Sequence, residues 1–222
     1  MPEIRVVIFD LDNTLVINKP AAKAAYEAAI RFLAKESKLE FDKLHNHWKR
    51  LVQKLATETA PEKRAFEYSL SVLAAEHHIS EKLIPLTVKA YEKELLANLK
   101  PMAGAKEIVS WVKETGGLVA VAAGTDRSLA KHKLKTVDLL KFVDCLVTSA
   151  DVGFMKPHSG YYTLIMDELK TTKSNTIVIS DSKKEDLEPA AKLGLKTIEV
   201  KPGSSHLTQF KPELSEFLSY SK

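Results

Sequence analysis

The chain has 222 residues, 45% of them hydrophobic, and a formal net charge of +4 at pH 7. This length suits one large domain or a domain with a sizeable insertion. No stretch approaches the roughly 18 apolar residues of a membrane span, and the first residues lack the features of a signal peptide, so we expect a cytoplasmic protein without a membrane partner. The mild positive charge favours small anionic ligands. Because the lysines are scattered and no basic stripe contains interleaved aromatic residues, we expect no nucleic-acid partner.

The first predicted element is a buried strand that ends in an acidic pair. Residues 5–9 are rich in β-branched and aromatic side chains, as expected for a strand that is buried on both faces. Asp10 therefore falls at the carboxyl end of this strand, which is where ligands bind in open α/β sheets. Asp12 follows two positions later, and we expect the chain to turn at Leu11 and bring both carboxylates round a common site.

A long helical block follows this strand. From Pro20 to about Asn98 the apolar residues recur with helical period, and no strand signal interrupts them. Breaks near residues 37–38, 59–61 and 78–80 divide the block into about four helices, which are enough for a small bundle. We therefore predict an all-helical domain over residues 18–100.

Strands and helices alternate in the remainder of the chain. Strands are predicted at residues 118–123, 145–148, 176–180 and 196–200, and helices at residues 105–114, 129–140, 161–169, 187–193 and 212–220. Such alternation predicts a Rossmann-like parallel sheet that is covered by helices on both faces. The α/β core domain would consist of residues 1–17 and 101–222, with the helical domain inserted after its first strand. Cys145, the only cysteine, falls in an apolar run and is expected to be a buried hydrophobe.

Three motifs in this arrangement resemble those of one known family. The run from Asp10 to Leu15, Asp-Leu-Asp-Asn-Thr-Leu, resembles motif I of the haloacid dehalogenase superfamily. Lys156 stands in a Gly-x-x-Lys-Pro sequence similar to motif III, and Asp181 with Asp186 resembles motif IV, where Ser180 replaces the usual glycine. The resemblance covers nearly the whole chain and implies that the helical insertion is a cap of the C1 type.

The resemblance also implies a role for each acidic residue. Asp10 would attack phosphorus to form an aspartyl-phosphate, and Asp12 would protonate the leaving group and then activate the hydrolytic water. Lys156 would balance the negative charges. Mg²⁺, which prefers hard oxygen ligands, would bind Asp10, the backbone carbonyl of Asp12, and Asp181. Asp186 would be a further metal ligand, direct or through water, and Glu185 could compete for that role.

The sequence departs from the family at the phosphate-binding hydroxyl of motif II. Ala123 occupies the usual position, counted back from Lys133, and it has no hydroxyl. The phosphate would then be held by Lys156 together with Thr125, after a local shift, or with the backbone N–H groups of Gly124 and Thr125. Alternatively, residues 124–126 only cap the next helix. Asn18 and Lys19, at the entrance to the cap, are the expected substrate contacts.

These motifs predict a Mg²⁺-dependent phosphatase that acts on a small phosphorylated metabolite. A phosphomutase of the β-phosphoglucomutase type would share the same core motifs. The absence of a hydroxyl at Ala123 motivates a further alternative, a non-catalytic phosphate-binding protein of the same fold. A haloacid dehalogenase is disfavoured, because members with that activity lack the acid at the Asp12 position and need no metal.

Overall fold

The computed structural model describes residues 4–58, 61–201 and 206–219. Contacts between residues divide the chain into two compact units, one made of residues 1–18 and 99–222 and the other of residues 19–98. In the described part of the chain, none of the helices is both long and apolar enough to cross a membrane.

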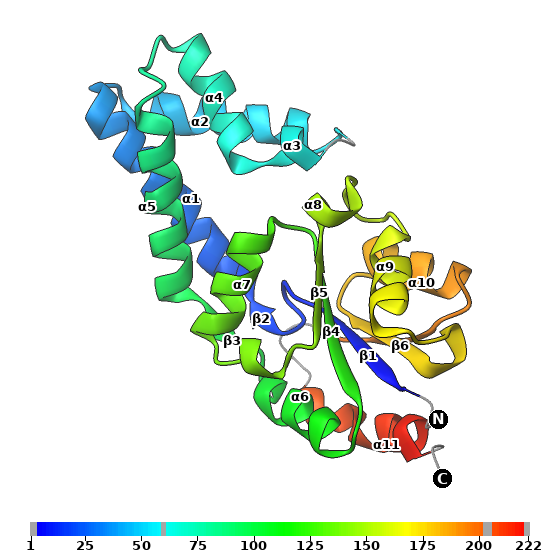
Figure 1. The fold of residues 1–222 in the computed structure, drawn as a ribbon. Helices are drawn as coiled ribbons and strands as arrows, with labels where there is room; N and C mark the ends of the chain where they lie inside the picture. Colours follow the sequence, from blue (N-terminus) through cyan, green and yellow to red (C-terminus); the bar gives the residue numbers. More distant parts are fainter. Residues whose placement is uncertain (1–3, 59–60, 202–205, 220–222) are drawn as a thin grey trace. The chain divides into compact units, whose positions relative to one another are not determined.

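The first unit is built on a parallel sheet of five strands, which confirms the predicted Rossmann-like α/β fold (Figure 1). The spatial order of the strands is β5-β4-β1-β6-β7, so β1 lies in the centre. The strands are β1 (Val6–Asp10), β4 (Leu118–Ala123), β5 (Cys145–Thr148), β6 (Thr176–Ser180) and β7 (Lys196–Glu199). Because all of them run parallel, their carboxyl ends meet at one edge of the sheet.

Burial explains why these strands could be predicted from apolar runs. Every residue of β1, β5 and β6 is buried, as expected for strands of a parallel sheet that is covered on both faces. The register places Asp10 opposite Ala122 of β4, and Phe9 opposite Ile179 of β6. Cys145 is buried in the core beside these strands, and burial raises the pKa of its thiol to about 12.

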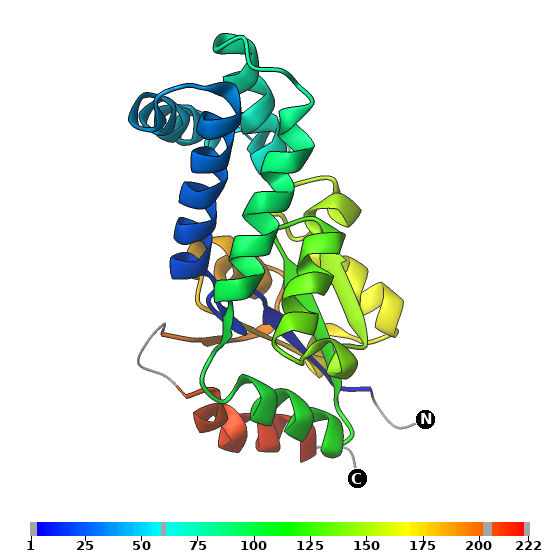
Figure 2. The same cartoon turned by 90° about the vertical axis from the view of Figure 1, so that its left-hand side faces the viewer.

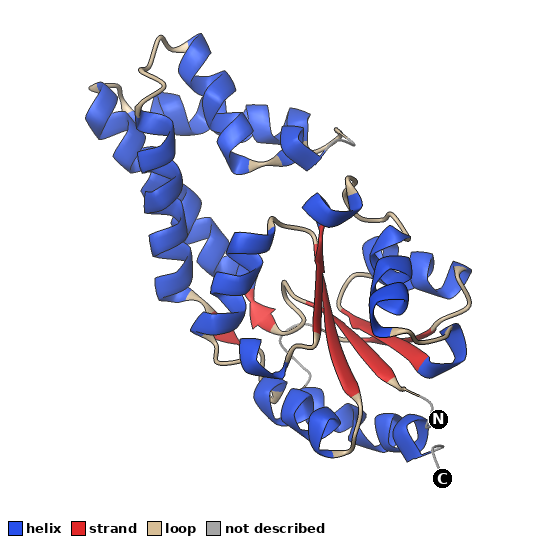
Figure 3. Ribbon diagram, viewed as in Figure 1, coloured by secondary structure: helices blue, strands red, loops and turns tan. Residues whose placement is uncertain are grey.

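Helices cover both faces of the sheet (Figures 1 and 3). Two helices pack on one face against apolar residues of β1, β4 and β5, the first through Tyr161, Tyr162 and Ile165 and the second through Ala190. That pair is α9 (Gly160–Leu169) and α10 (Glu188–Lys192). The opposite side carries α6 (Ala105–Glu114), α7 (Arg127–Thr136) and α11 (Lys211–Ser219). The predicted closing helix thus begins at Lys211, and its predicted last residue, Tyr220, lies outside the described residues.

Two short segments that sequence periodicity did not indicate appear near the helical insertion. β2 (Val16–Ile17) and β3 (Lys100–Pro101) pair in an antiparallel manner. The backbone N–H of Met102 also donates to the carbonyl of Leu15 at 2.8 Å. Two-residue strands are too short to show a period, so only the folded chain reveals this pairing.

The largest differences between predicted and observed helix ends concern α7 and the helix after β6. α7 ends at Thr136 rather than at residue 140, because Asp138 adopts a φ of 57° that a helix cannot continue through. The helix predicted from residue 187 is preceded by a π-helical turn, η3 (Lys183–Leu187). The other short helices are α8 (Ser149–Val152), η1 (Leu140–Phe142), η2 (Lys173–Asn175) and η4 (Leu207–Phe210).

The second unit is helical throughout its described residues. Its helices are α1 (Asn18–Ser37), whose first residue belongs to the first unit, α2 (Phe41–Leu55), α3 (Pro61–Arg64), α4 (Phe66–Glu76) and α5 (Leu83–Asn98). Figures 1 and 2 show α1 and α5 side by side, and Tyr26 stacks on Tyr91 with 4.7 Å between the ring centroids. Lys38 and His78 adopt positive φ values, which confirms two predicted breaks. The third predicted break includes residues 59 and 60, which lie outside the described residues.

Candidate active site

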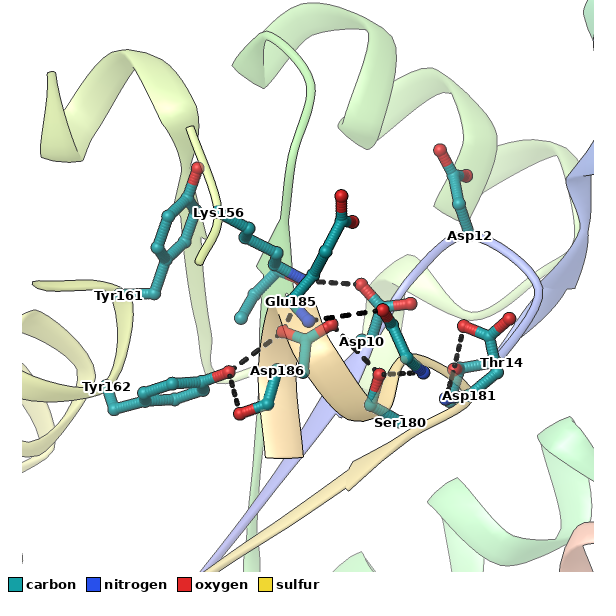
Figure 4. A network of polar contacts seen from close by, with 12 residues as sticks. Asp10, Asp12, Thr14, Lys156, Tyr161, Tyr162, Ser180, Asp181, Glu185 and Asp186 are labelled. Carbon is teal, nitrogen blue, oxygen red and sulfur yellow. Dashed lines mark hydrogen bonds and ion pairs between the residues drawn. The ribbon is translucent and has the colours of Figure 1, made fainter. Parts of the chain in front are cut away.

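Three buried charged side chains meet at the carboxyl end of β1 (Figure 4). The ammonium nitrogen of Lys156 lies 2.5 Å from Oδ1 of Asp10 and 2.7 Å from Oδ1 of Asp186. The same nitrogen donates to the carbonyl oxygen of Ala122 at 2.9 Å. Because an ammonium group has three N–H donors, each donor of Lys156 has an acceptor, and the position of the nitrogen is fixed. The structure therefore brings the predicted nucleophile and the predicted lysine into direct contact.

Burial strongly affects both partners of this contact. It raises the pKa of Asp10 to about 7, while the ammonium of Lys156 acts in the opposite direction and Asp186 adds to the rise. Burial also disfavours the charged form of Lys156, yet the two carboxylates hold the pKa of its ammonium above the usual range. With all three groups charged, two carboxylates share one ammonium, and the excess negative charge favours a cation beside Asp10.

A short capped helix brings the lysine of this cluster into place. Thr148 caps the N-terminus of the helix α8. Its backbone N–H and hydroxyl donate to Oδ2 of Asp151 at 2.7 and 2.6 Å. Gly153 ends the helix with a φ of 76°, a left-handed conformation that glycine adopts without strain. The hydroxyl of Tyr161 then donates to the carbonyl of Phe154 at 2.9 Å, which ties the following loop to α9.

Hydrogen bonds from neighbouring hydroxyl groups hold Asp186. Tyr162 donates to Oδ1 of Asp186 at 2.8 Å, and Ser180 donates to Oδ2 at 2.9 Å. Burial and the Asp186 carboxylate hold the pKa of Tyr162 above the usual range, so its phenol remains a hydrogen-bond donor. Oδ1 of Asp186 thus interacts with both Tyr162 and Lys156, whereas Oδ2 accepts only the hydrogen bond from Ser180 and keeps a lone pair for a further ligand.

The turn after β1 separates Asp12 from this cluster. Asn13 adopts a φ of 64°, and the carboxylate of Asp12 stands apart from the buried cluster (Figure 4). Its two oxygens accept hydrogen bonds from Nζ of Lys133 on α7, at 2.7 and 2.8 Å. Two residues further on, the hydroxyl of Thr14 accepts the backbone N–H of Asp181 at 2.9 Å, which ties the turn to the end of β6.

Oxygen donors at this edge fit a hard divalent cation. Asp10 ends β1, Asp181 follows the neighbouring strand β6, and the backbone carbonyl of Asp12 belongs to the turn between them. Within residues 4–58, 61–201 and 206–219, no group of three or more His, Cys, Asp and Glu side chains is placed to hold a metal. A cation here would therefore use two carboxylates, a backbone carbonyl and water, a ligand set that Mg²⁺ accepts.

The expected phosphate-binding segment follows β4. Ala123 pairs with Thr148 of β5 and is only 1% exposed, so its side chain is enclosed by the groups packed on the sheet. Gly124 is exposed and Thr125 is half-buried at the edge where the carboxylates lie. Asp126 caps α7, because its carboxylate accepts the backbone N–H of the residue three positions later at 2.9 Å. Asp126 therefore caps the helix, as the alternative expected, whereas Gly124 and Thr125 remain the candidate phosphate contacts.

We expect the substitution Ala123→Ser to leave phosphate binding unchanged, because the side chain at this position is enclosed. The competitive inhibition constant of inorganic phosphate, measured against p-nitrophenyl phosphate, should stay within about twofold of the wild-type value. A hydrogen bond from the new hydroxyl would tighten inhibition by about tenfold, the equivalent of roughly 1.4 kcal/mol. Tightening of that size would show that position 123 does reach the phosphate.

The two expected substrate contacts open the helix α1. Oδ1 of Asn18 is buried and has no hydrogen-bond partner among the described residues, whereas the side chain of Lys19 is exposed. Nearly all buried polar atoms in folded proteins have a partner, so this acceptor suits a donor from a bound molecule or water. Asn18 therefore remains a candidate for substrate contact.

Two residues of the site were missed from the sequence. Lys133 lies on the face of α7 formed by Leu129, Ala130 and Leu134, all buried, so a lysine at an apolar position was a usable signal. Tyr162 offered no such signal, because its bond to Asp186 joins a helix residue to one 24 positions later in the chain.

Comparisons with known proteins agree with this geometry. Residues 7–200 match the model of a family described as haloacid dehalogenase-like hydrolases. A ribulose-1,5-bisphosphate 5-phosphatase of Halopiger xanaduensis is 27% identical over 202 residues, which are 88% of this chain and 84% of the relative. A glyceraldehyde 3-phosphate phosphatase of Pyrococcus furiosus is 24% identical over 221 residues, 99% of this chain and 89% of the relative.

Solved structures show the same fold. The hydrolase YfnB of Bacillus subtilis, in a structure bound to magnesium, matches with a TM-score of 0.69 and 20% sequence identity. The match covers 96% of this chain and 99% of that chain. At this level of identity the likeness concerns the fold, and the chemistry has to be argued from the residues of the site.

Proposed function

From the premise that this chain belongs to the haloacid dehalogenase-like hydrolase family, we propose that it is a Mg²⁺-dependent phosphatase of a small phosphorylated metabolite. The observation that carries this proposal is the buried contact between Lys156 and Asp10 at the carboxyl end of the central strand. A carboxylate held by an ammonium at this edge is a suitable nucleophile for phosphorus, since the same positive charge also attracts the phosphate.

The reaction would proceed in two displacements at phosphorus, with an aspartyl-phosphate on Asp10 between them. A lone pair of its carboxylate forms a bond to phosphorus, the bond from phosphorus to the ester oxygen breaks, and that oxygen takes a proton from Asp12. Water then attacks the aspartyl-phosphate while Asp12 takes a proton from it, which releases inorganic phosphate and restores Asp10. General acid and base catalysis of this kind typically contributes about 10²- to 10⁴-fold to the rate.

The remaining residues would bind and orient the phosphate. Lys156 and the backbone N–H groups of Gly124 and Thr125 would contact its oxygens. Mg²⁺ would be held by Asp10, Asp181 and the backbone carbonyl of Asp12, and when bound it neutralises the negative charge that the phosphate brings to the carboxylates. Asp186 would contact the metal directly or through water, and it would also hold Lys156.

We infer the substrate class from the relatives. The two phosphatases described above are named for phosphorylated sugars and act on phosphate esters of small, hydroxyl-rich molecules. The mild positive charge of this chain suits such anions. Asn18, with its buried acceptor, would receive a hydroxyl donor of the sugar.

The proposal is tested by measuring release of inorganic phosphate from p-nitrophenyl phosphate and from a panel of sugar phosphates, phosphoglycolate and nucleotides. We expect turnover of p-nitrophenyl phosphate and of at least one sugar phosphate, with a rate that falls by at least about 100-fold in EDTA and returns with Mg²⁺. A rate that is unchanged in EDTA would contradict the metal site. Conversion of a sugar phosphate without release of phosphate would instead indicate a phosphomutase, and no reaction with any compound would contradict an enzyme of either kind.

A further inference from the structure

Lys133 is an ammonium group buried at a position where the helix α7 presents apolar residues. Its side chain is 3% exposed, whereas Lys131 and Lys135 on the same helix are exposed. Lysine is almost never fully buried unless its charge is paired, because removing an unpaired ammonium from water is costly. A buried lysine of this kind therefore needs a partner of opposite charge.

That partner is the carboxylate of Asp12. Nζ of Lys133 donates to both carboxylate oxygens, at 2.7 and 2.8 Å, and the two residues are 121 positions apart in the chain. The Asp12 side chain is 35% exposed, so the pair joins a buried ammonium to a carboxylate that still reaches solvent. An ammonium that contacts both oxygens restricts the rotation of the carboxylate and sets the direction in which it faces.

We propose that Lys133 is a positioning residue for proton transfer to the leaving group, an inference that rests on the proposed function. Asp12 is the group that would pass a proton to the ester oxygen when the bond between phosphorus and that oxygen breaks. Proton transfer requires the donor to lie within hydrogen-bond reach of the acceptor, and a displacement of about 1 Å can cost two orders of magnitude in rate. Lys133 holds the Asp12 side chain, and the carboxylate that remains after the transfer keeps its contact with the ammonium.

A purely structural role makes a different prediction. If Lys133 only ties α7 to the turn after β1, its loss would change all reactions of the enzyme alike. A role in leaving-group protonation affects only those substrates whose leaving group needs a proton. p-Nitrophenol is a much stronger acid than an alcohol, so its phosphate ester depends little on proton donation, whereas an alkyl ester such as glycerol 3-phosphate depends on it strongly.

The experiment compares both esters in the variants Lys133→Met and Lys133→Arg, with Lys131→Met as a control on the exposed face of the same helix. We expect Lys133→Met to lower kcat for glycerol 3-phosphate by about 100-fold and kcat for p-nitrophenyl phosphate by less than about fivefold. Lys133→Arg keeps the charge and should restore kcat for the alkyl ester to within about tenfold of the wild type. The control should resemble the wild type with both esters.

A double-mutant cycle tests whether Lys133 acts through Asp12. In an Asp12→Asn background, Lys133→Met should cause no further loss with glycerol 3-phosphate, because the group that it positions is already absent. Equal losses of kcat with the two esters, or a full additional loss in the Asp12→Asn background, would overturn the inference and leave the proposed function standing. Failure of the wild-type protein to hydrolyse these two esters or any compound of the panel would overturn both.

Methionine keeps most of the length of lysine and is apolar, so the variant suits the buried face of α7. Thermal unfolding of each variant, followed by circular dichroism, establishes that the activities are compared on folded proteins. If Lys133→Met is unfolded at the assay temperature, the Lys133→Arg variant carries the test. Its altered reach should then produce a smaller loss that still falls mainly on the alkyl ester, and an equal loss on both esters would overturn the inference.

Discussion

Replacing Asp10 with asparagine is expected to abolish turnover and, at the same time, to make the metal-free protein more stable. Asparagine has nearly the same shape as aspartate, and its amide oxygen can still accept the hydrogen bond from Lys156 that Asp10 receives at 2.5 Å. It is a far weaker nucleophile, and we expect a loss of at least about 10⁴-fold in kcat.

The gain in stability follows from the charges of the buried cluster. In the wild-type protein two carboxylates, Asp10 and Asp186, share the ammonium of Lys156, and all three side chains are at most 9% exposed. The Asp10→Asn variant would leave one carboxylate for one ammonium, which removes the repulsion and the burial of an excess charge. We expect the free energy of unfolding in EDTA to rise by about 1 to 2 kcal/mol, as is common when a strained active-site group is replaced.

Urea unfolding in EDTA measures this change, and initial rates with Mg²⁺ measure the loss of turnover. Asp138→Asn is a suitable control, because Asp138 is an exposed aspartate with two lysine partners on the surface, Lys106 and Lys141. Its replacement should change the unfolding free energy by no more than about 1 kcal/mol and leave activity unchanged. A clear decrease in the stability of Asp10→Asn would show that the Asp10 carboxylate stabilises the fold, and it would contradict an excess of buried negative charge in the cluster.

Replacing Lys156 with methionine is expected to remove activity and stability together. Three acceptors lose the N–H donors of Lys156 at once: Oδ1 of Asp10, the carbonyl of Ala122, and Oδ1 of Asp186, which keeps only its bond from Tyr162. The two buried carboxylates would then face each other without a positive charge between them. Breaking a buried ion pair by removing one partner typically costs about 3 to 5 kcal/mol, a large part of the total stability of a domain.

Urea unfolding compares this variant with Lys141→Met, which removes a lysine that is 56% exposed from an ion pair on the surface. The surface variant should lose no more than about 1 kcal/mol. Adding Asp186→Asn to Lys156→Met should return part of the lost stability, because one of the stranded carboxylates disappears, while activity stays absent. A loss below about 1 kcal/mol in Lys156→Met would mean that water reaches the cluster and screens its charges.

The parallel sheet could be predicted closely because its strands are buried on both faces. Residues 118–123, 145–148 and 176–180 were predicted as strands, and they are β4, β5 and β6 with the same bounds. A strand without a solvent face appears in the sequence as a continuous apolar run, which is a strong local signal. The pair β2 and β3 and the π-helical turn η3 had no such signal, because they are short and stabilised by contacts distant in the chain.

In the candidate site, too, some features had a local sequence signal and others depend on contacts distant in the chain. Asp10, Asp12, Lys156, Asp181 and Asp186 could be picked out because each follows a predicted strand or matches a motif, although their individual roles stay predictions. The hydrogen bonds that orient Asp186, from Tyr162 and Ser180, could not be foreseen, because they depend on how α9 and η3 pack on the sheet. The position of the Asp12 carboxylate likewise depends on a lysine from another helix.

The sequence by itself determined which chemical groups reach the edge of the sheet, because side-chain type and the ends of apolar strands are local properties of the chain. It placed the carboxylates of Asp10, Asp12, Asp181 and Asp186 and the ammonium of Lys156 at the carboxyl ends of strands or beyond them. Only the tertiary structure decided which opposite charges contact each other: Lys156 lies between Asp10 and Asp186, and Lys133 contacts Asp12. The physical reason is that a buried charge is stabilised mainly by the nearest opposite charge, and that neighbour comes from a distant part of the chain.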